Sequence, residues 1–235
     1  MRLPAPRSER SPSPAAPVSR GRTNTQRPRP RLYIVTPVLD DTAAFARDLE
    51  AALAAGDVAA VLLRLAEADE RPTINRAKNV AAVVQCRDIA LLVDGRPEIV
   101  ARAGADGAHL TGIEALRAAL PTLKPGRIVG AGGLHSRHDA MLAGEADADY
   151  VMFGEPDHGG SGGWPSLEAL TERLTWWAEL FQPPCVGYAA GKDEVRPLAE
   201  AGADFVALGD WIWTERGGAD RAVAAANDIL ATIVA

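Results

Sequence analysis

The chain has few cysteines, few aromatic residues and no long apolar run, and each absence narrows the class of protein. No run approaches the roughly 18 consecutive apolar residues of a membrane-spanning helix, so the sequence predicts none. Cys86 and Cys185 are too few for a disulfide framework and lack metal-ligand spacing, which favours a reducing, cytoplasmic setting. We expect both thiols to be buried as small apolar groups.

Charge is unevenly distributed along the 235 residues. Residues 1–30 contain seven arginines, seven prolines and one acid, Glu9; since the whole chain has a net charge of −6, residues 31–235 carry about −12. The N-terminal segment has no apolar periodicity with which to offset the entropy of ordering, so we expect a disordered extension. It also lacks the apolar centre of a secretory signal. The acidic remainder argues against general affinity for nucleic acid.

From residue 31 onward, short apolar runs alternate with Ala-rich helical stretches. Runs that are apolar on both faces are typical of a parallel sheet covered by helices. Eight such units predict an α/β fold in which residues 31–235 form a single (β/α)8 TIM barrel domain. A doubly wound sheet is the alternative, since strand order cannot be read from the sequence. The predicted strands are 32–36, 60–65, 89–93, 107–110, 127–131, 149–154, 185–188 and 204–209. The predicted helices lie near 42–54, 73–85, 97–103, 113–119, 137–144, 166–181, 193–201 and 219–233.

Three joints between a helix and the next strand have similar sequences: ARAGADGAHL, AGEADADYVMFG and AEAGADFVALG. Gly104 and Gly202 stand where a helix end needs a left-handed residue, and an aspartate then begins the next strand. The similarity indicates a repeated strand-helix unit, as a barrel requires.

The functional residues of such a barrel are expected just after each strand, because the C-terminal strand ends meet at one rim. Arg64 ends an apolar run, where a charge is costly unless it reaches the barrel mouth. Arginine and lysine side chains there suit an anionic substrate. Asp94 and Glu114 could share Mg2+ with substrate phosphates. The strand-end residues are Arg64, Asp94, Arg96, His109, Glu114, His135, Glu155, Asp157, His158, Gly191, Lys192, Gly209 and Asp210.

Position alone leaves several of these roles open. His109 suits a hydrogen-bonded structural residue as well as a catalytic one, and His135 carries an imidazole, the side-chain group best suited to proton transfer near neutral pH. The glycine-dense segment 154–168 suits either a lid or a plain connection. Gly191 and Lys192 begin a helix whose backbone N–H groups form a common type of anion site.

At this point the motifs resemble those of thiamine phosphate synthase and its relative TenI. The resemblance rests on LYIVT, LLRL, LLVDGR, GADGAHLTG and DADYVMFG, and it extends over residues 31–213. It implies a TIM barrel that joins a pyrimidine pyrophosphate to a thiazole phosphate, using Mg2+. TenI is a thiazole tautomerase; the span LHSRHDA resembles it at His135, which implies acid/base work for that residue.

Position and resemblance together give a set of expected site residues. The expected catalytic residue is His135, and the expected metal ligand is Glu114. The expected ligand is a small phosphorylated heterocycle, with no nucleic acid or membrane partner, and a homo-oligomer is left open. The expected substrate-binding residues are Arg64, Asp94, Arg96, His109, Gly133, Gly191, Lys192 and Gly209.

Several positions depart from the synthase pattern. Since leaving pyrophosphate needs positive charge around it, each lost contact is expected to cost about 2–4 kcal/mol of transition-state stabilisation. Two hypotheses therefore remain: an enzyme of this group, with His135 moving protons while Arg64 and Arg96 hold the substrate, or a catalytically silent barrel that binds a thiamine-related ligand or a partner protein. The departures are Ala66 for lysine, Gly95 for a metal-ligating aspartate, Gly133 for serine, Ala189 and Ala190 for paired glycines, and Asp210 for serine, together with a loop after Gly154 that has no lysine.

Overall fold

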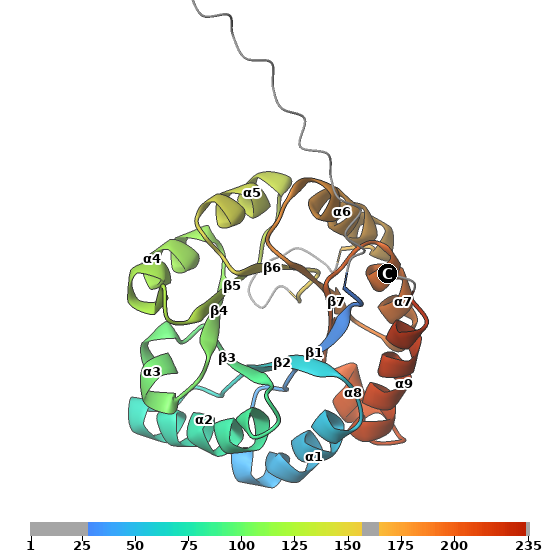
Figure 1. Ribbon diagram of the computed structural model, residues 1–235. Coiled ribbons are helices and arrows are strands. Elements are labelled where there is room, and N and C mark those ends of the chain that lie inside the picture. Colours follow the sequence, from blue (N-terminus) through green and yellow to red (C-terminus); the bar gives the residue numbers. More distant parts are fainter. Residues whose placement is uncertain (1–27, 157–164, 234–235) are drawn as a thin grey trace, which may run out of the picture.

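A computed structural model describes residues 28–156 and 165–233, and in it eight parallel strands close into a barrel ringed by helices (Figure 1). Each strand pairs with its neighbours in chain order, and β8 pairs with β1. The predicted (β/α)8 fold is confirmed, and the doubly wound alternative is wrong. The strands are β1 Arg31–Val35, β2 Val58–Leu63, β3 Ala90–Asp94, β4 Gly107–Thr111, β5 Ile128–Gly132, β6 Tyr150–Phe153, β7 Cys185–Ala189 and β8 Phe205–Leu208.

The helices lie outside the barrel and follow the predicted order, with small differences in their bounds and one additional helix. Helix α2 begins earlier than predicted, α4 continues past Pro121, and the short helix α8 was not predicted. The N-terminal extension predicted over 1–30 falls almost wholly on residues 1–27, outside the described part. The helices are α1 Thr42–Ala54, α2 Glu70–Gln85, α3 Val100–Ala103, α4 Ile113–Leu123, α5 Arg137–Glu145, α6 Leu167–Leu180, α7 Val195–Glu200, α8 Trp211–Thr214 and α9 Ala219–Ala231, with single 3-10 turns η1 Pro97–Ile99 before α3 and η2 Lys192–Glu194 before α7.

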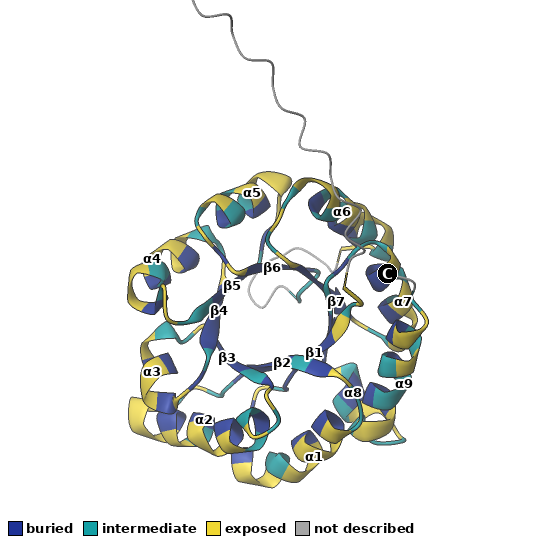
Figure 2. Ribbon diagram, in the orientation of Figure 1, coloured by how far each residue is buried: buried dark blue, intermediate teal, exposed yellow. Residues whose placement is uncertain are grey.

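The buried side chains form two layers because strand residues alternate between the two faces of the sheet. One layer lies between the barrel and the inward faces of the helices, which Figure 2 shows as buried. The other fills the barrel interior, where Leu62, Leu92, Met152 and Val186 pack together with the rings of three tyrosines. The barrel is therefore a packed core, and ligands must be sought at its ends.

The three similar helix-to-strand joints have the same geometry. In each, the aspartate before the strand accepts a hydrogen bond from a backbone N–H at the start of the preceding strand and donates its own N–H to that residue's carbonyl. Gly104 and Gly202 have the left-handed φ that was predicted, and Asp147 takes that position in the third joint. The three pairs are Asp106 with Leu91, Asp149 with Val129, and Asp204 with Cys185.

The two cysteines differ in exposure. Cys185 is buried as expected, but Cys86 is exposed, so that expectation is wrong for Cys86. Cys86 is the C-cap of α2 and begins the turn that continues through Arg87 and Asp88. Among the described helices, none has the length and apolar character needed to cross a membrane.

Candidate active site

Arg64 lies at the C-terminal end of β2 with its side chain only 6% exposed. Its backbone N–H donates to the Thr36 hydroxyl at 3.0 Å, and its Nε donates to the Thr36 carbonyl at 2.6 Å. Its terminal nitrogen forms an ion pair with Asp210, which follows β8. The barrel therefore brings residues 64 and 210 together at the mouth, where the arginine is fixed on both sides.

His109 lies inside the barrel near the mouth and is fully buried. Its Nδ1 lies 2.8 Å from the Tyr150 hydroxyl, and its Nε2 lies 2.8 Å from Oε1 of Glu155. The Tyr150 hydroxyl in turn lies 2.9 Å from that of Tyr33. A continuous hydrogen-bond chain thus runs from the mouth into the barrel. Its four side chains are Glu155, which follows Gly154, His109 on β4, Tyr150 on β6 and Tyr33 on β1.

The electrostatics of this chain follow from its burial and its carboxylates. Burial lowers the pKa of His109, but the charge and hydrogen bond of Glu155, with the charge of Asp94, outweigh it and raise that pKa. Burial raises the pKa of Tyr33 and Tyr150, so both stay protonated. A protonated His109 donates from both ring nitrogens, to Glu155 and to Tyr150. The arrangement can therefore hold a proton close to the mouth.

Glu155 is the side chain that connects this chain to the mouth, and it is 17% exposed. Its second oxygen accepts a hydrogen bond from the N–H of Gly133 at 3.0 Å. A Cβ on Gly132 would lie 1.7 Å from that oxygen and 2.4 Å from His109 Nε2, so glycine is required for this approach. Sequence reasoning placed Glu155 at a strand end without giving it a role. Its position directly after Gly154, in line with β6, was the available signal.

A second cluster lies where β7 and β8 end. The hydroxyl of Tyr188 accepts a hydrogen bond from the backbone N–H of Asp210. A Cβ on Gly209 would lie only 1.9 Å from the same hydroxyl. Burial, followed by the charge of Asp210, raises the pKa of Tyr188 to about 12. The sequence reasoning missed all three interior tyrosines, although they occupy inward positions of predicted strands.

The loop after β7 contains Gly191 and Lys192, both expected to bind substrate. Lys192 is exposed and begins the short turn η2. In the same loop, the N–H of Ala190 donates to the carboxylate of Glu194 at 2.7 Å. The structure thus places residues 191 and 192 at the rim, and their role in binding stays a prediction.

His135 lies between β5 and α5 with an exposed side chain. Its carbonyl accepts a hydrogen bond from Arg173, and the next residue, Ser136, caps α5 through a reciprocal pair with Asp139. Within residues 28–156 and 165–233, no hydrogen bond joins the His135 imidazole to another group. The fold therefore places His135 at the rim, separate from the buried His109 chain, and its catalytic role stays a prediction.

The remaining expected ligands lie on the β3 and β4 side of the mouth. Asp94 ends β3 opposite His109 on β4, Arg96 precedes η1, and Glu114 is exposed on the first turn of α4. In the described part of the chain, no three Asp, Glu, His or Cys side chains form a metal cluster. Two carboxylates alone still fit a hard cation such as Mg2+ when substrate oxygens and water complete its coordination. Asp157 and His158 lie outside the described residues, as does most of the glycine-dense segment.

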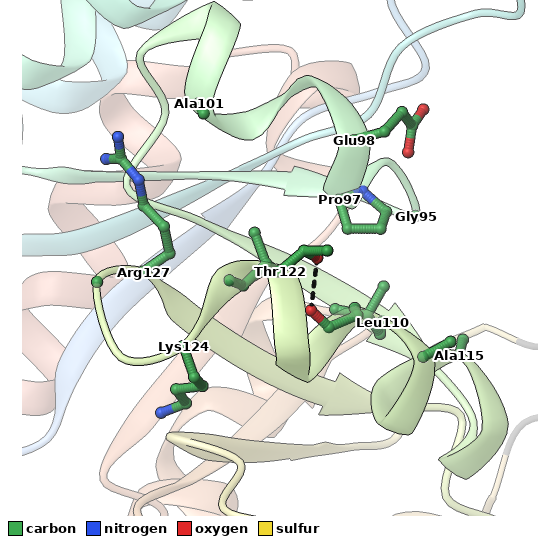
Figure 3. A pocket seen from close by; sticks show the side chains of 13 residues that line it. Gly95, Pro97, Glu98, Ala101, Leu110, Ala115, Thr122, Lys124 and Arg127 are labelled. Carbon is green, nitrogen blue, oxygen red and sulfur yellow. Dashed lines mark hydrogen bonds between the residues drawn. The ribbon is translucent and has the colours of Figure 1, made fainter.

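A groove of about 830 Å3 lies on the outside of the barrel between η1, α3 and α4 (Figure 3). Leu110 contributes to its lining, and on β4 it points away from the barrel interior that His109 faces. Its two basic side chains already have partners: Lys124 pairs with Asp149, and Arg127 donates to the Ala105 carbonyl. The groove therefore lies on the helix side of β4, whereas the His109 side chain lies on the barrel side.

Comparisons with known proteins give matches over most of the described chain. A family model described as "Thiamine monophosphate synthase" matches residues 32–212. The chain is 41% identical over 207 residues to a protein named thiamine-phosphate synthase from Rhodospirillum centenum, covering 85% of this chain and 97% of that protein. A protein of the same name from Hyphomonas neptunium is 36% identical over 222 residues, covering 90% and 99%. A thiamine phosphate pyrophosphorylase from Pyrococcus furiosus has a similar fold, with a TM-score of 0.69 at 22% identity, covering 86% and 95%.

Proposed function

The chain belongs to the thiamine monophosphate synthase family, and from that membership we propose that it joins a pyrimidine pyrophosphate to a thiazole in thiamine synthesis. The observation that carries the proposal is the buried Arg64, whose guanidinium is held at the barrel mouth by Thr36. Its ion pair with Asp210 compensates the buried charge in the free protein, and an anionic substrate at the mouth can take the place of that carboxylate. We assign the reaction to the cytoplasm.

In the proposed site, the pyrophosphate lies toward the β3 and β4 side. Arg96 and Arg64 supply positive charge, while Asp94 and Glu114 would hold Mg2+. That ion, when bound, neutralises charge that develops on the leaving pyrophosphate. His109 and Gly133 act through Glu155, which they orient toward the mouth. Gly191, Lys192 and Gly209 form the opposite side of the same mouth.

The proposal is tested with purified protein, both substrates and Mg2+, with the joined product followed by mass spectrometry. Arg64→Ala is expected to lower kcat/KM by a factor of about 100, corresponding to about 2.7 kcal/mol of lost charge stabilisation. Arg117, exposed on the outer helix α4, provides the matched control, and Arg117→Ala should leave the rate unchanged. Product formation that survives in Arg64→Ala at the wild-type rate would exclude this role for Arg64.

A thiazole tautomerase activity is the second candidate, and the hydrogen-bond chain from Glu155 to Tyr33 favours it. Such a chain can accept and return a proton at the mouth, as tautomerisation requires. His135→Ala should slow tautomerisation of a thiazole carboxylate phosphate if the rim imidazole moves the proton, and Glu155→Gln should slow it if the buried chain does. An unchanged rate in His135→Ala removes that residue from the mechanism. Ligand binding without either reaction would instead support the hypothesis of a catalytically silent barrel.

A further inference from the structure

Glu155 is a carboxylate that the barrel holds in one position at its mouth. Its Oε1 lies 2.8 Å from Nε2 of the buried His109, and its Oε2 accepts a hydrogen bond from the N–H of Gly133 at 3.0 Å. A Cβ on Gly132 would lie 1.7 Å from Oε2, so the carboxylate occupies the space that a side chain on β5 would otherwise fill. The group is therefore held by β4 and β5, although it follows β6 in the chain.

Three other carboxylates of the mouth have different partners or roles. Asp210 forms an ion pair with Arg64, and in the proposed site Asp94 and Glu114 would hold Mg2+. Glu155 remains 17% exposed while its two oxygens are held in place. Because a carboxylate repels a pyrophosphate, Glu155 must face a part of the substrate that carries hydrogen-bond donors.

The position of the pyrophosphate indicates which part of the substrate this is. In the proposed site the pyrophosphate lies toward β3 and β4, where Asp94 and His109 are paired across the two strands. A single carbon joins the pyrophosphate to the pyrimidine, so the ring must lie immediately beside it. Since Glu155 contacts the same His109, the ring and the carboxylate meet at the β4 and β5 side of the mouth.

The pyrimidine half of thiamine carries an exocyclic amino group, whose N–H groups are hydrogen-bond donors. An ionised carboxylate has about four acceptor positions, so Glu155 can accept such a donor beside its bonds to His109 and Gly133. We infer that Glu155 recognises the pyrimidine substrate by accepting a hydrogen bond from this amino group. His109 and Gly133 are then positioning residues, which hold the carboxylate for the contact.

The inference rests on the proposed condensation and adds a residue that selects its first substrate. A site that is built to bond a donor discriminates against an analogue that lacks it, because its own polar group then loses its solvent without gaining a partner. A pyrimidine with hydrogen in place of the amino group would leave the Glu155 carboxylate in this situation. The structure therefore predicts selection for an aminopyrimidine.

The test uses two probes, the aminopyrimidine pyrophosphate and the same compound with hydrogen in place of the amino group. Calorimetric titration in the presence of Mg2+ measures both affinities. The wild-type protein should bind the amino form about thirtyfold more tightly, as expected for a hydrogen bond to an ionised acceptor. Glu155→Gln should reduce this preference to about fivefold, because a hydrogen bond to a neutral acceptor has about half the strength. Glu145→Gln makes the same change on an exposed residue at the C-terminal end of α5, and it should leave both affinities unchanged.

The ratio of the two affinities separates recognition from a structural effect. If Glu155 only stabilises the mouth, Glu155→Gln would weaken the binding of both probes by the same factor, and the ratio would stay at the wild-type value. That result, in a variant that circular dichroism shows to be folded, would overturn the inference. The comparison in the wild-type protein needs no variant, and affinities for the two probes that agree within about threefold would also overturn it.

A product assay with a thiazole phosphate separates this inference from the proposed condensation. Product from the aminopyrimidine, together with equal affinity for the two probes, contradicts the inference alone. A preference for the amino form that falls in Glu155→Gln, without any product, supports the inference and contradicts the condensation. Failure of the wild-type protein to bind either pyrimidine contradicts both.

Discussion

At the scale of single residues, the mouth of this barrel is organised by charges that are paired before any ligand arrives. Arg64 is paired with Asp210, and the buried His109 with Glu155. Burying a charge without a partner costs free energy, so these ion pairs make it possible for the fold to bury Arg64 and His109 near the mouth. The same pairing sets what a ligand meets, because it must replace a partner or bind beside one.

The first prediction concerns the pH dependence of the His109–Glu155 pair. Because the pKa of His109 is raised in the folded protein, the stability from its protonated form is fully present below the unfolded pKa of about 6.5 and is lost as pH rises through the folded pKa. Glu155→Gln should therefore lower the free energy of unfolding by about 1.5–3 kcal/mol near pH 6 and by much less near pH 9.

Urea unfolding at the two pH values measures this difference, with NMR following the imidazole. Glu98→Gln, at an exposed carboxylate in the η1 turn, is the control and should show no such dependence. A destabilisation by Glu155→Gln that is equal at both pH values would show that the His109 charge contributes nothing.

The second prediction concerns Gly132, whose missing side chain makes room for Glu155. Gly132→Ala would place a Cβ 1.7 Å from the carboxylate and 2.4 Å from His109, so both side chains must move. We expect a loss of about 1–3 kcal/mol in the free energy of unfolding, as for other overpacked sites. Gly126→Ala is the matched control, because a Cβ there has no neighbour within 4 Å. Equal stability of the two variants would contradict the close approach.

At the scale of elements, the repeated helix-to-strand joint fixes the order of the strands at the barrel's N-terminal end. Each aspartate of the joint ties its own strand to the preceding one by two hydrogen bonds. Sequence predicted these joints well, because a left-handed residue and an aspartate are local requirements. It predicted α8 poorly, because a four-residue helix has too few residues to show periodicity.

The third prediction tests one such joint. Asp204→Ala removes the acceptor of the Cys185 N–H, which the structure shows at 2.8 Å. A buried donor left without a partner costs about 1–3 kcal/mol, so the midpoint of urea unfolding should fall accordingly. Asp228→Ala, on the exposed face of α9, should change stability by less than about 0.5 kcal/mol. If Asp204→Ala leaves the stability unchanged, another group must replace the Asp204 carboxylate as acceptor of the Cys185 N–H without loss of free energy.

At the scale of the whole molecule, the barrel and the strand ends at its mouth could be predicted because they depend on periodicity along the chain. The partners of those residues could not, because they depend on which strands are neighbours around the closed ring. Arg64 and Asp210 are far apart in sequence yet adjacent through β1, which lies between β2 and β8. The alternation that buries Tyr150 and Tyr188 inside the barrel was visible, but their bonds to His109 and Asp210 were not.

The last prediction uses the stability of the whole molecule to separate the two sides of the mouth. If Asp94 and Glu114 hold Mg2+ against the pyrophosphate, then pyrimidine pyrophosphate should raise the melting temperature strongly only when Mg2+ is present. Saturation at about 100 times the Kd corresponds to about 2.7 kcal/mol of stabilisation.

Chelation of Mg2+, or Asp94→Asn, should remove most of that gain, whereas the stabilisation by a thiazole should persist, because its side of the mouth contains no metal ligand. Asp88→Asn, in the turn after α2, is the control and should respond to Mg2+ like the wild type. A pyrophosphate effect that is the same with and without Mg2+ would show that Arg64 and Arg96 bind it without the metal, and would remove Asp94 and Glu114 from the metal site.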